Sequence, residues 1–201
     1  NLGITGGNRA WTAGIDHSRF LKWTEVFWTE EENLPAYLPD GRLISKARSY
    51  KLARAFDNVV FTYAPTPLAM AECLALNQTL GYVGTHPLPA EVLRYIAFYR
   101  KHRDLFVGTQ DWAEVAVLRS HPSITYNHAQ AQLAAILVEQ ALLQARVPFR
   151  LIFDGQLEDL ADVRSLVLPD SECLSDIQIQ QIERFVAGGG GLAATGRAGM
   201  Y

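Results

Sequence analysis

The residues of this chain best suited to chemistry are three consecutive glutamates, Glu30, Glu31 and Glu32. They follow Thr24–Thr29, where polar and bulky apolar residues mix as they do in a strand. In parallel α/β barrels, a polar residue at the carboxyl end of a strand faces the active site. A carboxylate there can serve as the nucleophile of glycoside hydrolysis, with a second carboxylic acid as proton donor. The simpler alternative, a solvated acidic loop, stays open because charge runs usually lie on the surface.

A run of four glycines, Gly188–Gly191, is the second feature that resembles a functional motif. It precedes the apolar stretch Gly191–Thr195, whereas phosphate-binding glycines follow a strand and open a helix. Glycine also serves as a helix C-cap and in tight turns, because it accepts a positive φ. We therefore expect a structural role for this run.

Cys173 follows the apolar run Ser165–Leu168, at a turn that opens a helix, where a thiolate can be activated. It lacks the glycine-flanked elbow that holds a nucleophilic cysteine on such a sheet, so a packing role is favoured. The histidines show no spacing typical of metal ligands or of a catalytic dyad: His17, His86, His102, His121 and His128. We expect no metal and no cofactor.

The first half of the chain must position the glutamates with few strands. Besides Thr24–Thr29, the run Val59–Tyr63 is β-branched and aromatic without alternation, which is typical of a parallel strand buried on both faces. Apolar spacing, caps and prolines predict four helices: Asp16–Lys22, Leu43–Phe56, Leu68–Asn77 and Ala90–Arg103. Two strands are too few to bury a layer of helices alone.

A second α/β series begins after a boundary near Gly108–Asp111. The predicted strands are Ala113–Leu118, Pro148–Phe153, Ser165–Leu168 and Gly191–Thr195, and the predicted helices are His128–Ala145 and Ser175–Ala187. A loop is expected through Pro122 and Tyr126. Because strands alternate with helices, the pattern predicts a parallel sheet of the Rossmann-like or flavodoxin-like kind.

The composition excludes several classes of protein. The chain has 201 residues, of which 49% are apolar and 19% charged, so it can bury a core. A net charge of −3 argues against nucleic acid or a membrane surface as partner, and no apolar run approaches the ~20 residues of a membrane span. Cys73 and Cys173 lie far apart and are expected to be free thiols in a reducing, cytoplasmic compartment.

The second half also contains a specific set of short motifs. They are Pro148-Phe149, Leu166-Val167-Leu168-Pro169, Leu174-Ser175-Asp176, and Phe185 to Leu192 with Ala194-Thr195-Gly196. With these motifs, residues 115–196 resemble a glutamine-amidotransferase-like domain. In glycoside hydrolase family 42 β-galactosidases and related glycosidases this domain follows the catalytic barrel, and it is also called the β-galactosidase trimerisation domain. The family's domain lacks the amidotransferase nucleophile, in keeping with the missing elbow at Cys173.

The resemblance implies an α/β protein in which residues 1–108 are the C-terminal portion of a (β/α)8 barrel. Residues 109–201 would then be a flavodoxin-like or Rossmann-like, amidotransferase-like domain, truncated at its C-terminus. It places the nucleophile at Glu30, at the end of the seventh barrel strand, with Glu31 and Glu32 as register alternatives. The general acid belongs on a fourth strand that this chain does not contain.

The implied partners are a carbohydrate substrate and further copies of the protein in a homo-oligomer. Two alternatives remain at this point. The chain is a non-catalytic assembly or ligand-binding module, or it is an active amidotransferase, which needs a Cys–His pair.

Overall fold

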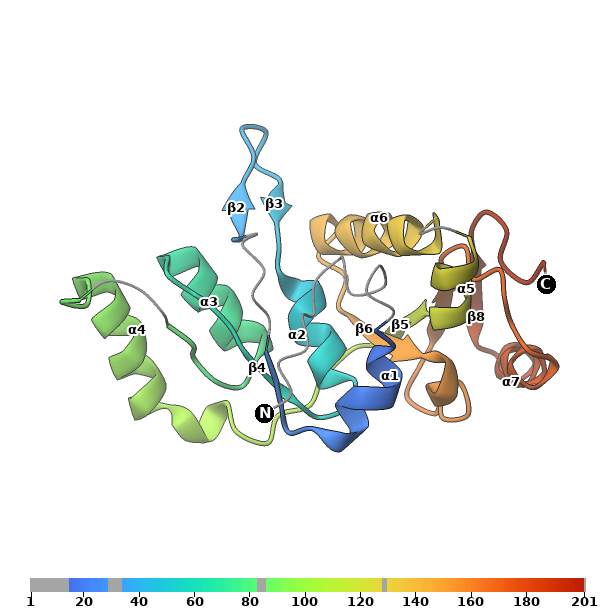
Figure 1. Cartoon of the computed structure of the whole chain (residues 1–201), viewed down its shortest axis with the longest axis horizontal. Coiled ribbons are helices and arrows are strands. Elements are labelled where there is room, and N and C mark those ends of the chain that lie inside the picture. The colour runs from blue at the N-terminus through green and yellow to red at the C-terminus, as the bar shows by residue number, and fades with distance from the viewer. Residues whose placement is uncertain (1–14, 29–33, 83–85, 128–129, 201) are drawn as a thin grey trace. The chain divides into compact units, whose positions relative to one another are not determined.

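The computed structural model describes residues 15–28, 34–82, 86–127 and 130–200 (Figure 1). The chain divides into two compact units. The first unit consists mainly of Arg19–Gln110 and the second mainly of Asp111–Tyr201. Within the described ranges, no helix combines the length and the apolar character needed to cross a membrane.

A pair of short parallel strands is the centre of the first unit. Strand β1 (Val26–Trp28) pairs with β4 (Val59–Phe61), with Val26 opposite Val59. The chain between them forms the antiparallel hairpin of β2 (Ala36–Tyr37) and β3 (Leu43–Ile44), followed by helix α2 (Ala47–Arg54).

Helices make up most of the rest of this unit. They are the second half of α1 (His17–Phe20), the 3-10 turn η2 (Leu21–Trp23), α3 (Pro67–Leu76), α4 (Ala90–Lys101) and η3 (Arg103–Leu105). At the start of α3, the Thr66 side chain accepts a hydrogen bond from the Ala69 N–H at 3.2 Å, and Pro67 occupies the first turn. This is the helix start that proline predicts from the sequence.

Two expectations for the first unit are wrong in part. The helix predicted over Leu43–Phe56 begins only at Ala47, because Leu43 and Ile44 pair with β2 across a turn in which Gly41 has a φ of +83°. Strand β4 is not buried on both faces: Val60 is 1% exposed, but Phe61 is 48% exposed. A sheet of only two strands is too small to be buried on both faces, in agreement with the small number of strands predicted for this half of the chain.

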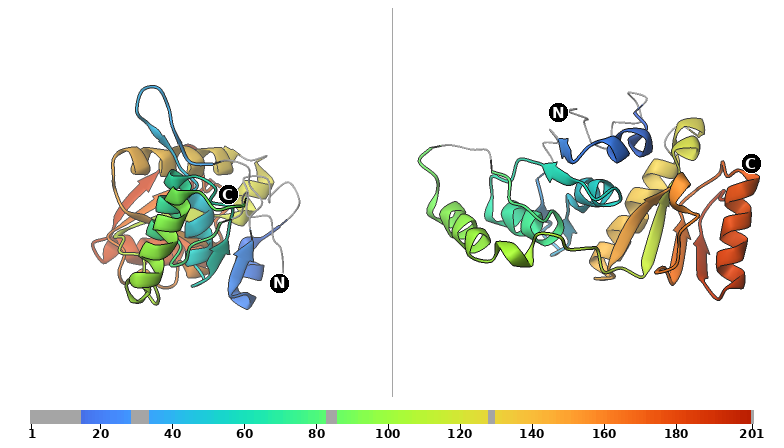
Figure 2. Two further views of the ribbon diagram at one scale, coloured as in Figure 1. Left: turned by 90° about the vertical axis from the view of Figure 1, so that its left-hand side faces the viewer. Right: turned by 90° about the horizontal axis from the view of Figure 1, so that it is seen from below.

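The second unit contains a four-stranded, fully parallel sheet. Its strands are β5 (Val115–Arg119), β6 (Phe149–Phe153), β7 (Ser165–Leu168) and β8 (Gly191–Ala194). Their spatial order is β6-β5-β7-β8, which is the order of the first four strands in a doubly wound sheet. Figure 2 shows this sheet from two directions. The prediction of an α/β protein with a parallel sheet is confirmed.

Helices cover both faces of this sheet. Ala116 and Leu118 belong to an apolar cluster with Ile182 of helix α7 (Asp176–Ala187). On the opposite face, the guanidinium of Arg119 donates to the side-chain oxygen of Gln132 in helix α6 (Gln130–Gln144). Such alternation of faces along a strand is what the pleat requires.

Two short helical segments complete the second unit, α5 (His121–Tyr126) and the 3-10 turn η4 (Asp154–Gln156). The loop expected through Pro122 and Tyr126 is therefore wrong. The Ser120 side chain caps α5 by accepting from the Ser123 N–H, and Pro122 lies in the first turn. Ser120, two residues before Pro122, is a helix-start signal that can be recognised in the sequence.

Candidate functional site

The predicted nucleophile Glu30 and its alternatives Glu31 and Glu32 lie outside the described residues. The strand that precedes them is described. Strand β1 ends at Trp28, opposite Phe61 of the parallel strand β4, so Glu30 follows the carboxyl end of a parallel strand by two residues in the sequence.

A half-buried carboxylate from α3 caps the N-terminus of α2. The Glu72 oxygens accept the backbone N–H of Lys46 at 3.0 and 3.1 Å, and Oε1 also accepts the Ser45 hydroxyl. Lys46, at the N-cap position of α2, makes no capping hydrogen bond with its own side chain. The negative charge of Glu72 is favourable there because the N-terminus of a helix is partially positive. This contact joins the helix before β4 to the helix after it.

Burial is the main cause of the pKa shifts of Glu72 and its neighbours. It raises the pKa of the Glu72 carboxyl, and hydrogen bonds from Ser45 and Lys46 oppose this rise. Burial also raises the pKa of Tyr50, with smaller contributions from Cys73 and Glu72, and it raises the pKa of the Cys73 thiol. The oxygens of Glu72 are engaged at the helix terminus, so the geometry indicates a structural carboxylate rather than an acid that reaches a substrate.

The second unit presents its own candidate edge, because doubly wound sheets bind ligands at the carboxyl ends of their strands where the strand order reverses. Here that point lies between β5 and β7. It is filled by the fully buried Glu172, which forms an ion pair with Arg197 at 2.5 Å and accepts from the Asn127 amide at 3.2 Å. The Cys173 N–H donates to the Ser123 hydroxyl at 3.0 Å. The protein's own side chains thus occupy this edge.

The loops after β7 and β8 are joined in the same way. The Asp170 N–H donates to the Thr195 hydroxyl, and Asp170 Oδ1 accepts the Arg197 N–H, both at 3.2 Å. A Cβ at Gly196 would lie only 1.6 Å from Asp170 Oδ1, which explains a glycine at this position. These contacts lock the two loops together.

Asp154 braces the carboxyl end of the neighbouring strand β6. Its carboxylate accepts the His121 N–H at 2.9 Å and the Gln178 side-chain amide at 3.3 Å. Burial raises the pKa of Asp154, and hydrogen bonds from His121 and Ser120 oppose this rise. The sequence around Asp154 does not predict this role, because its two main partners, His121 and Gln178, belong to other elements.

The glycine run is a helix cap, as predicted. The Gly190 N–H donates to Phe185 O at 3.0 Å and the Gly189 N–H to Val186 O at 2.9 Å, which is the pair of bonds of a Schellman motif. Gly189 has a φ of +96°, in the left-handed region that favours glycine. No phosphate-binding geometry is involved.

The cysteines have the properties of packing residues. Cys73 is fully buried, and its thiol donates to Thr79 O at 3.2 Å. Cys173 is half-buried, and burial followed by the charge of Glu172 raises the pKa of its thiol. A raised pKa disfavours the thiolate, which is the nucleophilic form. The prediction that Cys173 is not an activated nucleophile agrees with this environment.

The histidines are dispersed. His128 lies outside the described residues, and within the described ranges no three His, Cys, Asp or Glu side chains gather closely enough to hold a metal ion. His102 packs on the Phe98 ring, with centroids 4.8 Å apart.

His86, expected at the surface, is exposed and borders a pocket of about 580 Å³ in the first unit. The other residues that line this pocket are Leu80, Tyr82, Leu88, Ile96, Tyr99 and Arg100. All these residues lie within positions 80–100, but no motif among them predicts a pocket from the sequence.

These observations define the class as a mixed α/β protein with a parallel sheet. No family model matches the sequence, and no curated protein matches it. The solved structures that are similar to it include two β-galactosidases at low identity.

The first is a β-galactosidase from Bifidobacterium adolescentis, with 21% identity and a TM-score of 0.40, covering 43% of this chain and 42% of that one. The second is a catalytic mutant of Gan42B, a GH42 β-galactosidase from G. stearothermophilus. It has 17% identity and a TM-score of 0.47, and the match covers 90% of this chain and 28% of that one. The chain spans less than half the length of both structures. At these values the likeness assigns neither a family nor a function.

Proposed function

We propose that this chain is part of a glycoside hydrolase and that Glu30 is its catalytic nucleophile, with Glu31 and Glu32 as register alternatives. The observation that carries the proposal is the parallel pairing of β1 with β4. In the sequence, Glu30 comes two residues after the carboxyl end of this parallel strand, and barrel enzymes carry catalytic residues after the carboxyl ends of their strands. In the proposal, residues 1–108 belong to the end of a (β/α)8 barrel and residues 109–201 to an amidotransferase-like domain.

The chemistry requires two carboxyl groups. In a retaining mechanism, Glu30 attacks the anomeric carbon and forms a glycosyl-enzyme ester, while an acid about 5 Å away protonates the leaving oxygen. Water then hydrolyses the ester with that second group acting as base. Glu72 is not this second group, since both its oxygens serve the N-terminus of α2. As the family resemblance implies, the proposal assigns the acid to the fourth strand of the barrel.

Replacing the nucleophile is the direct test. We expect Glu30→Gln in the full-length protein to lower kcat on aryl glycosides, an aryl β-galactoside first among them, by on the order of 10³-fold or more. Glu31→Gln and Glu32→Gln test the register. Glu25→Gln is the matched control, because Glu25 is an exposed carboxylate just before the same strand. Full activity of all three variants in the 30–32 run would refute the assignment.

Covalent trapping gives an independent readout. A 2-deoxy-2-fluoro aryl glycoside slows hydrolysis of the glycosyl-enzyme ester, so the labelled residue can be found by peptide mass spectrometry. The expected label lies on Glu30. A label on a carboxylate outside the run would place the nucleophile elsewhere while keeping the reaction class.

A second candidate function, a non-catalytic assembly module, is favoured by helix α6 in the second unit. This helix buries Gln132 and Glu139, whereas Leu133 is 50% and Leu137 is 61% exposed. Polar residues inside and leucines outside invert the usual amphipathic arrangement, and exposed apolar surface marks interfaces. This candidate predicts a homo-oligomer by analytical ultracentrifugation that Leu137→Glu dissociates. A monomeric wild type at all concentrations would count against it.

A further inference from the structure

The pocket of about 580 Å³ in the first unit has the size of a small-molecule site, for which volumes of about 300–1,000 Å³ are typical. Helix α4, at the left of Figure 1, forms one side of it. Ile96, Tyr99 and Arg100 line the pocket, and their spacing of three and four residues places them on one face of the helix. A regular element thus forms part of this pocket.

The α4 side of the pocket is held in place through Tyr99. Its hydroxyl donates to Gln78 O at 3.4 Å, and its ring centroid lies 5.7 Å from that of Phe106. These contacts fix the helix against the chain that follows α3.

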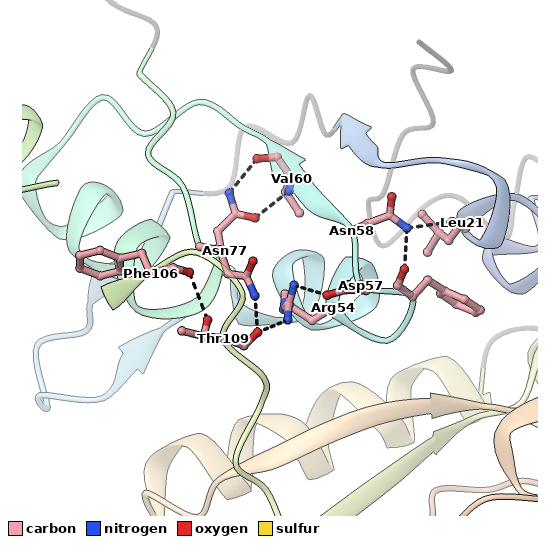
Figure 3. A network of polar contacts seen from close by, with 10 residues as sticks. Leu21, Arg54, Asp57, Asn58, Val60, Asn77, Phe106 and Thr109 are labelled. Carbon is pink, nitrogen blue, oxygen red and sulfur yellow. Dashed lines mark hydrogen bonds and ion pairs between the residues drawn. The ribbon is translucent and has the colours of Figure 1, made fainter. Parts of the chain in front are cut away.

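The facing side carries Leu80 and Tyr82, and the chain that leads into it is anchored to strand β4. The anchor is the side chain of Asn77 at the end of α3 (Figure 3). The Val60 N–H donates to Asn77 Oδ1 at 2.6 Å, and Asn77 Nδ2 donates to Val60 O at 2.7 Å. With both sides held, the pocket is formed in advance of any ligand, as small-molecule sites usually are.

Three polar side chains line the pocket without a partner in the described part of the chain. The Tyr82 hydroxyl, the His86 imidazole and the Arg100 guanidinium form no hydrogen bond or ion pair there. Each of them carries at least one hydrogen-bond donor, and the guanidinium is always charged. None of the described residues that line the pocket is acidic. The pocket therefore offers donors and positive charge without a counter-charge of its own.

The rest of the lining is apolar. Leu80, Leu88 and Ile96 contribute aliphatic side chains, and Tyr82 and Tyr99 contribute flat rings. A ring-shaped molecule packs well on such rings. A few polar groups in an otherwise apolar lining are the usual composition of a ligand site.

We infer that this pocket binds a small anion with a ring-shaped apolar body and one carboxylate or phosphate group. The Arg100 guanidinium pairs with the anionic group, since its fork of donors matches carboxylate and phosphate oxygens. His86 and Tyr82 donate further hydrogen bonds, and the ring lies among the aliphatic side chains. The inference rests on this pocket alone and does not depend on Glu30 or on the glycosidase proposal.

Ligand-observed NMR titrations of the full-length protein test the pocket with benzoate, phenyl phosphate and the neutral benzyl alcohol. We expect saturable binding of an anionic probe, with a Kd at least about tenfold lower than that of benzyl alcohol. The preferred anion identifies the group that the pocket recognises. Arg100→Met should raise this Kd about tenfold or more, and Tyr82→Phe about threefold to fivefold. Lys101→Met is the matched control, because both basic residues lie in the last turn of α4 but only Arg100 lines the pocket.

The outcomes separate a binding site from general attraction. Equal effects of Arg100→Met and Lys101→Met would mean that the basic end of α4 merely attracts anions, and the inference would be overturned. Equal Kd values for benzyl alcohol and the anions, or no saturable binding of either anion, would also overturn it. Arg100 is exposed, so its replacement should leave the fold intact. Full activity of Glu30→Gln refutes the proposed chemistry and leaves the probe titrations untouched.

Discussion

The two units complete their central strands in different ways. In the second unit, β5 has a parallel strand on each side, β6 and β7, so its peptide groups pair with other backbones. In the first unit, β4 has a strand on one side only, and an asparagine side chain occupies the other. Backbone pairing distributes the stabilisation over many residues, whereas the first unit concentrates it on a few side chains.

A second asparagine strengthens this contrast. Asn58, fully buried just before β4, donates to Leu21 O at 2.8 Å and to Phe56 O at 3.3 Å (Figure 3). Its oxygen accepts the Thr24 hydroxyl at 3.2 Å. Asn58 thus ties the chain before β1 to the start of β4. In the second unit the comparable side-chain bonds lie at the loops after the strands, as with Glu172 and Asp170.

The largest effect is expected from the ion pair between Glu172 and Arg197 at those loops. Arg197→Met leaves the fully buried Glu172 carboxylate without its cation, and Arg197 itself is about half exposed. We expect a loss of about 2–3 kcal/mol of unfolding free energy, at the lower end for broken buried pairs because solvent screens Arg197. Denaturant titration of the full-length protein measures it.

Arg164→Met is the matched control for this loss. Arg164 pairs with Glu114 at 3.1 Å, and both side chains are largely exposed. Exposed pairs contribute about 0–1 kcal/mol. Equal losses in the two variants would show that the carboxyl edge of the second unit does not depend on Glu172.

The same contrast explains what the sequence predicts well. Strands β5 to β8 and helix α7 follow from apolar runs, a Ser175 cap and a glycine stop, because these signals lie within the elements themselves. The N-terminus of α2 was missed because Glu72, 25 residues after Ala47, caps it. The hydrogen bonds of Asn77 to β4 cannot be predicted from the sequence either, since no local pattern indicates that an asparagine side chain pairs with a strand. Glu30 stays a prediction from its position in the chain.

An intermediate effect is expected from pH. Burial raises the pKa of Glu72 above its ordinary value of 4.5, so between that value and the raised pKa the folded state binds more protons than the unfolded state. Stability must then fall as pH rises through this interval. Glu72→Gln keeps an acceptor for the Lys46 N–H and removes the titration, so the difference in Tm between variant and wild type should grow in the variant's favour as pH rises from 4 upward.

Asp154 extends this test to the second unit. Burial raises its pKa as well, so Asp154→Asn should show the same sign of pH dependence. Glu114→Gln, at an exposed site, serves as the control in both series. A difference in Tm that is constant with pH would mean that the carboxyl in question keeps its ordinary pKa in the folded protein.

The smallest effect separates backbone conformation from packing within a single cap. Gly189 has a φ of +96°, and a Cβ there meets nothing within 4 Å, so Gly189→Ala costs only conformational energy, about 1 kcal/mol. At Gly190 a Cβ would lie 2.4 Å from the Phe185 ring, so Gly190→Ala disturbs packing instead. Gly155→Ala should be near neutral. Because Phe185 packs against the apolar cluster of the second unit, Gly190→Ala should also loosen α7 in hydrogen exchange, whereas Gly189→Ala should affect only its last turn. Identical exchange patterns in the two variants would mean that the end of α7 frays freely and that the cap does not set the packing of Phe185.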